Sequence, residues 1–146
     1  MDTIVKETAV SPHVQGGGST ASVTRFLAVD GSQIAYEDTG GNGQLILAIP
    51  GMGDLRSEYR LLRPRLQGAG YRVVTMNVRG FGESSARWPD YSAHAVGCDA
   101  LALIEHLKAG SAVILGNSFA AGGGAVGSAR CAGARERRCA IGPHCA

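Results

Sequence analysis

Long apolar runs are missing from this 146-residue sequence. The longest, Leu45–Ile49, is far too short to cross a bilayer, so we expect no membrane-spanning segment and no membrane partner. Residues 1–20 carry charges and no apolar core, unlike a secretory signal. Only one cysteine, Cys98, lies before residue 125. A chain with neither a signal nor paired thiols is expected in a reducing cytoplasm.

The composition is not that of a disordered chain, which is poor in apolar residues. Apolar residues make up 45% of the sequence and charged residues 18%, both close to globular averages. The length is that of one domain. Residues 1–21 include three consecutive glycines and are expected to form a flexible lead-in.

Charge and cysteine are unevenly distributed along the chain. Residues 1–124 hold ten Lys/Arg against eleven Asp/Glu, whereas residues 125–146 hold four arginines against Glu136 alone. The ligand-type side chains of that tail are Cys131, Cys139, His144 and Cys145. Their spacing contains no C-x-x-C or H-x3-H pair, so no metal site is predicted. The arginine-rich stretch 135–138 has no interleaved aromatic residue and is typical of a solvated run, so no nucleic-acid partner is expected.

Between residues 22 and 124 the hydrophobic pattern alternates between strands and helices. Two strand-like runs are joined by Asp30-Gly31, a strong hairpin signal. Three further runs are typical of strands buried on both faces. The expected strands are 24–29, 32–37, 45–49, 71–76 and 112–115. A short helical stretch places Tyr59, Leu62 and Leu66 on one face and is interrupted at Pro64, and a longer helix is expected over 92–108.

This order predicts an α/β domain whose sheet begins with an antiparallel hairpin and continues with parallel strands. The carboxyl ends of parallel strands meet at one edge of a sheet, where ligands bind. Two glycine-containing turns fall at that edge. One is Pro50–Asp54 and the other is Gly116–Ala120.

The second turn has the form of a nucleophile elbow. G-x-S-x-G places a serine on a strained strand-to-helix turn, and the residues two positions away must be small. Gly116 and Ala120 satisfy this requirement around Ser118, although alanine replaces the usual glycine. Taken alone, Ser118 is equally well explained as a helix N-cap.

The first turn can supply a backbone donor to a developing oxyanion. The expected donors are the N–H groups of Met52 and of Phe119, the residue after the candidate nucleophile. A simple turn is the alternative interpretation of residues 50–54.

Residues 23–124 resemble the N-terminal half of a serine α/β-hydrolase. The resemblance is carried by three motifs in order, 50–53, 77–84 and 116–120. The middle motif resembles the family's D-x-R-G-x-G-x-S loop with Asn77 in place of Asp, and Pro50 stands where many members have His. The resemblance implies a sheet whose second strand is antiparallel, with Ser118 following the fifth strand. Residues expected to support the elbow and loops are Gly51, Gly116, Ala120, Arg79, Gly80 and Gly82.

The resemblance implies two-step acyl transfer to water from a small ester-like substrate, with no cofactor or metal. Ser118 would be the nucleophile, and an acid and a histidine would follow it in the chain. After Ser118 the sequence offers no aspartate, Glu136 as the one glutamate, and His144 as the one histidine. No buried-strand pattern accompanies them, so the triad is not completed. The other histidines are His13 in the lead-in and His94 and His106, which are expected at the surface of the helix.

The tail from residue 125 onward is atypical, and we interpret it as a possible shifted reading frame. Arg, Ala, Gly and Cys, which GC-rich codons give out of frame, dominate it, and the periodicity ends there. Such a chain leaves the fifth strand as an apolar edge and is expected to be marginally stable, with little or no esterase activity. A truncation or a natural short domain are the alternatives, and the oligomeric state is left open.

Two other functional classes remain at this point. A non-catalytic relic or interaction domain on the same fold fits the missing triad members. A dinucleotide-binding domain is suggested by Gly51-Met52-Gly53 after a strand. However, Arg56 stands where the third glycine belongs, and Asn77 replaces the acid.

Overall fold

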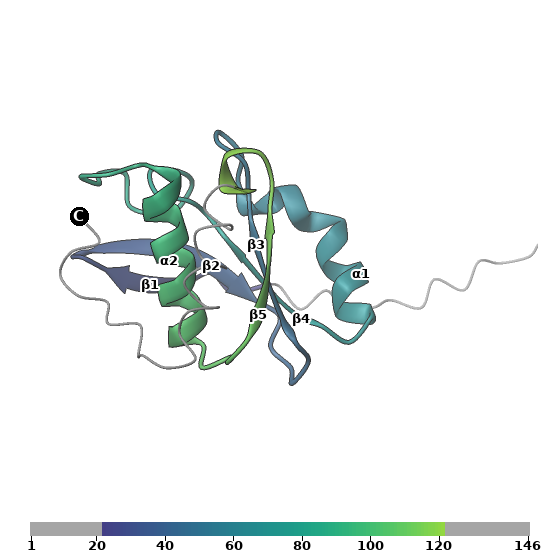
Figure 1. Ribbon diagram of the computed structural model, residues 1–146. Helices are drawn as coiled ribbons and strands as arrows, with labels where there is room; N and C mark the ends of the chain where they lie inside the picture. Colours follow the sequence, from purple (N-terminus) through teal and green to yellow (C-terminus); the bar gives the residue numbers. More distant parts are fainter. Residues whose placement is uncertain (1–21, 122–146) are drawn as a thin grey trace, which may run out of the picture.

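The computed structural model describes residues 22–121 of the chain. These residues form a five-stranded mixed sheet in the order β1-β2-β4-β3-β5, with helices packed against it (Figure 1). The predicted lead-in and tail lie outside the described residues. So do the tail cysteines, His13, Glu136 and His144.

The sheet begins with the predicted hairpin. β1 (Arg25–Val29) pairs with β2 (Ser32–Asp38) antiparallel. Asp30 and Gly31 both have positive φ, 48° and 76°, as a two-residue turn that matches the strand twist requires. The hairpin prediction is confirmed, and β2 runs one residue beyond its expected end.

The three remaining strands run parallel to one another. β2 pairs antiparallel with β4 (Arg72–Met76), which pairs parallel with β3 (Leu45–Ile49). β3 in turn pairs parallel with β5 (Ala112–Gly116). This confirms the predicted sheet, which begins with an antiparallel hairpin and continues with parallel strands.

The prediction that β5 is a buried strand is wrong within residues 22–121. All five residues of β3 are buried, whereas no residue of β5 is, and Val113 is 46% exposed. The difference follows from position in the sheet. β3 has a neighbour on each side, and among the described residues β5 pairs only with β3.

The chain after β3 forms two short helices rather than one. A 3-10 helix, η1 (Arg56–Arg60), is followed by α1 (Leu62–Gly68). The break falls before Leu62, and Pro64 sits in the first turn of α1, where its missing N–H is not needed. The prediction that Tyr59 and Leu62 share one face is wrong. Leu62 is 39% exposed whereas Tyr59 is buried, because the two residues lie on different helices.

The long helix α2 (Ala93–His106) forms as expected, although it ends two residues early. Its N-cap is Ser92, whose hydroxyl accepts the backbone N–H of Ala95 at 3.2 Å. Lys108 has a φ of 50°, a left-handed conformation that ends the helical region.

Helices cover both faces of the sheet (Figure 1). On one face α2 packs its apolar side on the strands, and the cluster includes Leu47, Val74 and Leu103. Alternate strand residues such as Ile46 and Val73 point to the opposite face, where α1 contacts β4. Across the described part of the chain, no helix has the length and apolar character to cross a membrane.

Candidate functional site

Two turns meet at the carboxyl edge of the parallel strands. We call them the glycine loop (residues 50–54, after β3) and the serine turn (residues 116–120, after β5). A Cβ atom added to Gly51 would lie 3.6 Å from the Cβ of Ser118 and 3.6 Å from the carbonyl oxygen of Asn117. The two turns are therefore close neighbours, with space for little more than a methyl group between Gly51 and the serine turn.

Ser118 occupies a strained backbone conformation. Its φ is 51°, in the left-handed region that residues with a Cβ rarely adopt. Backbone hydrogen bonds hold this conformation: Ala120 N–H donates to Asn117 O, and Ala121 N–H donates to Ser118 O, both at 3.0 Å. The side chain is exposed and makes no hydrogen bond with any residue from 22 to 121, so it is not acting as an N-cap there.

Small residues flank Ser118 for a steric reason. A Cβ on Gly116 would come within 2.8 Å of the carbonyl oxygen of Ala120 and 3.0 Å of the Ala121 nitrogen. Ala120 itself is fully buried. The turn therefore requires glycine at its first position and accepts the methyl group of alanine at the last.

The backbone N–H groups of Met52 and Phe119 flank the same region. In the described chain neither donates a hydrogen bond in any turn, loop or cap. Met52 and Phe119 also line one hollow of about 310 Å³, which we call the apolar hollow. Its other lining residues are Val78, Arg79, Gly80, Phe81, Ala86, Tyr91 and Val96. The arrangement places two unused donors and an apolar recess beside one exposed hydroxyl.

Comparison with known proteins identifies the family. The family model described as alpha/beta hydrolase fold matches residues 44–129. The chain belongs to the alpha/beta hydrolase fold family. That span includes both the glycine loop and the serine turn.

Solved structures that resemble this hydrolase-fold chain include proteins named as hydrolases and a peroxidase. A bromoperoxidase from Bacillus anthracis is 30% identical with a TM-score of 0.67, the match covering 72% of this chain and 38% of that one. The thioesterase domain from the curacin biosynthetic pathway is 26% identical, with a TM-score of 0.67 and coverage of 75% and 41%. An epoxide hydrolase from Vigna radiata is 25% identical, with a TM-score of 0.64 and coverage of 72% and 35%.

The chain thus spans only about two fifths or less of the length of these proteins. Their activities differ although their fold is shared. Family membership removes the dinucleotide-binding alternative. The geometry agrees, because the glycine loop leads into the short η1 and not into the helix that a dinucleotide fingerprint opens.

The loop after β4 (residues 77–84) supports the site in this hydrolase fold. Arg79 is 4% exposed and forms a two-pronged ion pair with the fully buried Asp99, at 2.5 and 2.9 Å. It also donates to the carbonyl oxygen of Asp90 at 3.0 Å and lies 4.3 Å from the ring centre of Trp88. Arg79 is thus held by several partners and also lines the apolar hollow, while its supporting role stays a prediction.

The two glycines of this loop are required by close approaches. Gly80 has a φ of 82°, and a Cβ there would lie 2.9 Å from the Tyr91 ring. Gly82 has a φ of 56°, and a Cβ there would collide with the side-chain amide of Asn77. Asn77 accepts the backbone N–H of Arg56 at 2.8 Å, which ties the loop to η1.

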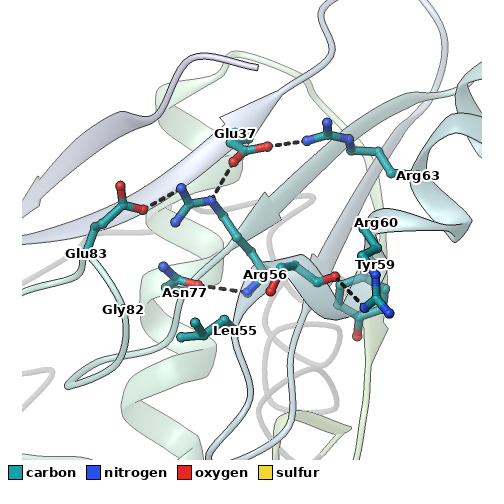
Figure 2. A pocket seen from close by; sticks show the side chains of 10 residues that line it. Glu37, Leu55, Arg56, Tyr59, Arg60, Arg63, Asn77, Gly82 and Glu83 are labelled. Atoms are coloured by element: carbon teal, nitrogen blue, oxygen red, sulfur yellow. Dashed lines mark hydrogen bonds and ion pairs between the residues drawn. The ribbon is translucent and has the colours of Figure 1, made fainter. Parts of the chain in front are cut away.

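A second hollow, of about 440 Å³, is lined in part by residues of η1 and is drawn in Figure 2. Arg56 points into it between Glu37 and Glu83 and pairs with both, and Arg63 pairs with Glu37 from the other side. Burial alone would raise the pKa of Glu37, but bonds from Ser22, Arg56 and Arg63 outweigh it and hold that pKa below its usual range. Because these charged groups satisfy one another, we interpret the hollow as structural.

Sequence reasoning missed the part that η1 plays at the site. The Tyr59 hydroxyl donates to Ile49 O at 2.8 Å, and burial, with the charges of Glu58 and Asp54, raises its pKa to about 12. Tyr59 therefore stays neutral and keeps its donor. Glu58 accepts hydrogen bonds from both turns. An acidic residue in the first turn of a helix that follows a glycine loop was the only sequence signal for it.

The described histidines stand apart from Ser118. His94 and His106 are exposed on α2, as predicted. His94 lies 3.7 Å from the Cys98 sulfur, and His106 packs edge-on against Tyr36. Within residues 22–121 no group of three or more metal-ligating side chains occurs.

Proposed function

We propose that the glycine loop and the serine turn form the nucleophile and the oxyanion hole of a serine hydrolase that acts on ester-like carbonyl groups. The observation that carries the proposal is Ser118. Its hydroxyl is exposed and unbonded in the described chain, on a strained turn that lies close to the loop after the neighbouring parallel strand. Strain of this kind is retained where a side chain must be presented to a ligand.

The proposed first step is acylation. Ser118 Oγ attacks the carbonyl carbon, its proton passes to a base, and the carbonyl π electrons move onto oxygen. The N–H groups of Met52 and Phe119 donate to that oxyanion. When the tetrahedral intermediate collapses, the alcohol leaves with the proton from the base, and the acyl group stays on Ser118. The base then takes a proton from water, which attacks the acyl carbon. The bond from that carbon to Ser118 Oγ breaks, the carboxylic acid leaves, and Oγ takes the proton back from the base.

The apolar hollow supports an apolar substituent on the substrate. The lining side chains of Val78, Phe81, Val96 and Phe119 offer no hydrogen bonds, and the one charged lining residue, Arg79, is already paired with Asp99. An alkyl or aryl group placed there would be removed from water at about 25 cal/mol per Å². We therefore expect p-nitrophenyl butyrate to react faster than the acetate.

The base is the part that the described residues do not supply. His144 is the one histidine after Ser118 in the sequence, and the absence of a buried-strand pattern around it disfavours the role. We expect little turnover from the chain alone, because general-base catalysis contributes about 10²- to 10⁴-fold. Added imidazole supplies a diffusible base and should raise the Ser118-dependent rate about tenfold or more.

The test is hydrolysis of p-nitrophenyl butyrate by the whole chain, with and without imidazole. Ser118→Ala measures the background that imidazole produces by itself, and Ser111→Ala, an exposed serine before β5, is the matched control. The proposal predicts an imidazole-stimulated rate that Ser118→Ala lacks and Ser111→Ala keeps. Equal rates in the wild type and Ser118→Ala would refute it.

A non-catalytic binding domain on the same fold is the second candidate. It is favoured by the Ser118 hydroxyl, which has no histidine or other side-chain partner among the described residues. A fluorophosphonate probe with imidazole separates the two, because it reacts only with a serine that the surroundings can activate. No reaction at Ser118 would favour the binding domain.

A further inference from the structure

Glu58, in the 3-10 helix η1, contacts both turns of the proposed site with one carboxylate. Its Oε1 accepts the side-chain amide N–H of Asn117 at 2.6 Å. Its Oε2 accepts the backbone N–H of Gly51 at 3.4 Å. One side chain therefore joins the glycine loop to the serine turn.

Both contacts lie next to the proposed oxyanion donors. Met52 follows Gly51 directly, and Phe119 is two residues beyond Asn117. A hydrogen-bond donor assists the reaction only when it lies about 2.7–3.1 Å from the oxyanion. Because the two donors come from different turns, their aim at a common point depends on how the turns are placed relative to each other.

Glu58 is well placed to fix that relation because η1 is itself anchored. The neighbouring Tyr59 donates its hydroxyl hydrogen to Ile49 O at 2.8 Å, at the end of β3. The same oxygen accepts the backbone N–H of Asn117 at 3.3 Å. The end of β3, the helix η1 and the start of the serine turn are thus joined at one oxygen, and Glu58 adds the bond that reaches Gly51.

We propose that Glu58 is a positioning residue that holds the donors of Met52 and Phe119 in register. The inference rests on the proposed function. Glu58 acts through geometry, because a negative charge close to a developing oxyanion opposes that oxyanion. Removing only its charge would therefore help the reaction, whereas removing its two hydrogen bonds would harm it.

Glutamine in place of Glu58 separates these effects. A carboxylate offers acceptors on both oxygens, but an amide offers one acceptor and one donor. In Glu58→Gln both bonds can survive without the charge, because the glutamine oxygen accepts from Gly51 N–H and its NH2 group donates to Asn117 Oδ1 once the Asn117 amide rotates. Glu58→Leu instead removes both acceptors. Asn117→Asp sets two carboxylates against each other. The double variant restores both bonds, because the introduced glutamine donates to the introduced aspartate and accepts from Gly51.

The test uses the whole chain and the rate at which a fluorophosphonate labels Ser118 with imidazole present. We expect Glu58→Leu and Asn117→Asp each to slow labelling about tenfold, the weight of one hydrogen bond to a charged group, whereas Glu58→Gln should label at least as fast as the wild type. The double variant should recover most of the loss. Ser57→Ala, an exposed neighbour on η1, should label like the wild type. An unchanged or faster rate in Glu58→Leu, or a double variant (Glu58→Gln with Asn117→Asp) no faster than Asn117→Asp alone, would overturn the proposal.

A second measurement keeps this inference separate from the proposed function. If the wild type is not labelled, the proposed function fails, and ¹H–¹⁵N spectra still test Glu58. The backbone amide signals of Met52 and Phe119 should both move further from their wild-type positions in Glu58→Leu than in Glu58→Gln. Signals that stay in place in Glu58→Leu would show that Glu58 does not position the donors.

Discussion

The loop after β4 and the turn after β5 lie at the same edge of the sheet, and both fall within the residues that match the family model. Their polar side chains are used differently. In the β4 loop, Asn77, Arg79 and Ser84 are buried. Ser84 Oγ, for example, accepts Ala35 N–H and donates to Asn77 O, both at 2.9 Å. In the serine turn, Ser118 is exposed and its hydroxyl has no partner among the described residues.

The two segments show that belonging to the fold and taking part in the reaction are separate properties of a residue. The match to the family model shows only that both segments belong to the fold. Only the inventory of hydrogen bonds shows which side chains are already engaged and which remain free to act on a substrate. Substitutions in the β4 loop should therefore lower stability, whereas substitutions of Ser118 should change reactivity with little loss of stability.

The largest effect is expected at Arg79. Replacing it with alanine leaves the fully buried Asp99 carboxylate without its ion-pair partner, which costs about 3–5 kcal/mol of unfolding free energy. Arg87→Ala, at an exposed arginine, should change stability by no more than about 0.5 kcal/mol. Urea unfolding of the three proteins measures both values. A loss below about 1 kcal/mol in Arg79→Ala would break the contrast between the two regions.

A smaller loss is expected at Gly82. Alanine there combines a positive φ with a collision against the Asn77 amide, and we expect about 1–3 kcal/mol of destabilisation. Gly68→Ala is the matched control, because a Cβ at Gly68 has no atom of the described chain within 4 Å and its φ is not positive. Thermal unfolding should show Gly68→Ala unchanged or slightly more stable than the wild type. Equal losses in both variants would contradict the account of this loop.

At Ser118 we expect a stability difference between two substitutions of the same residue. Glycine adopts positive φ without strain, so Ser118→Gly should be more stable than Ser118→Ala by about 1 kcal/mol. Both variants should lose reactivity toward a fluorophosphonate. A less stable Ser118→Gly, measured by urea unfolding, would mean that the turn stores no strain at this residue.

The smallest expected effect concerns pH and the anchoring of the β4 loop. Arg56 pairs with Glu83 of that loop and with Glu37, whose pKa is held below its usual range. A lowered pKa stabilises the fold above the ordinary carboxyl value, about 4.3, and that contribution is lost as pH falls through the folded-state pKa. The wild type should therefore lose more unfolding free energy between neutral and acidic pH than Arg56→Gln. Identical pH profiles would show that the pairs contribute nothing.

Local patterns in the sequence predicted much of the fold. Asp30-Gly31 fixed the hairpin because few residues adopt its two positive φ values, and the small residues around Ser118 predicted the serine turn. The burial of β5 was not predictable, since an apolar run looks the same in the middle of a sheet and at its edge. Glu58 was missed because its partners, Gly51 and Asn117, are brought to it only by the folded sheet.

The most direct test of the central claim is to map a fluorophosphonate adduct on the whole chain by peptide mass spectrometry with imidazole present. We predict one adduct, on the peptide that contains Ser118, which is absent in Ser118→Ala and present in Ser111→Ala. An adduct confined to another residue, or the same yield in Ser118→Ala, would contradict the claim that the serine turn presents a nucleophile.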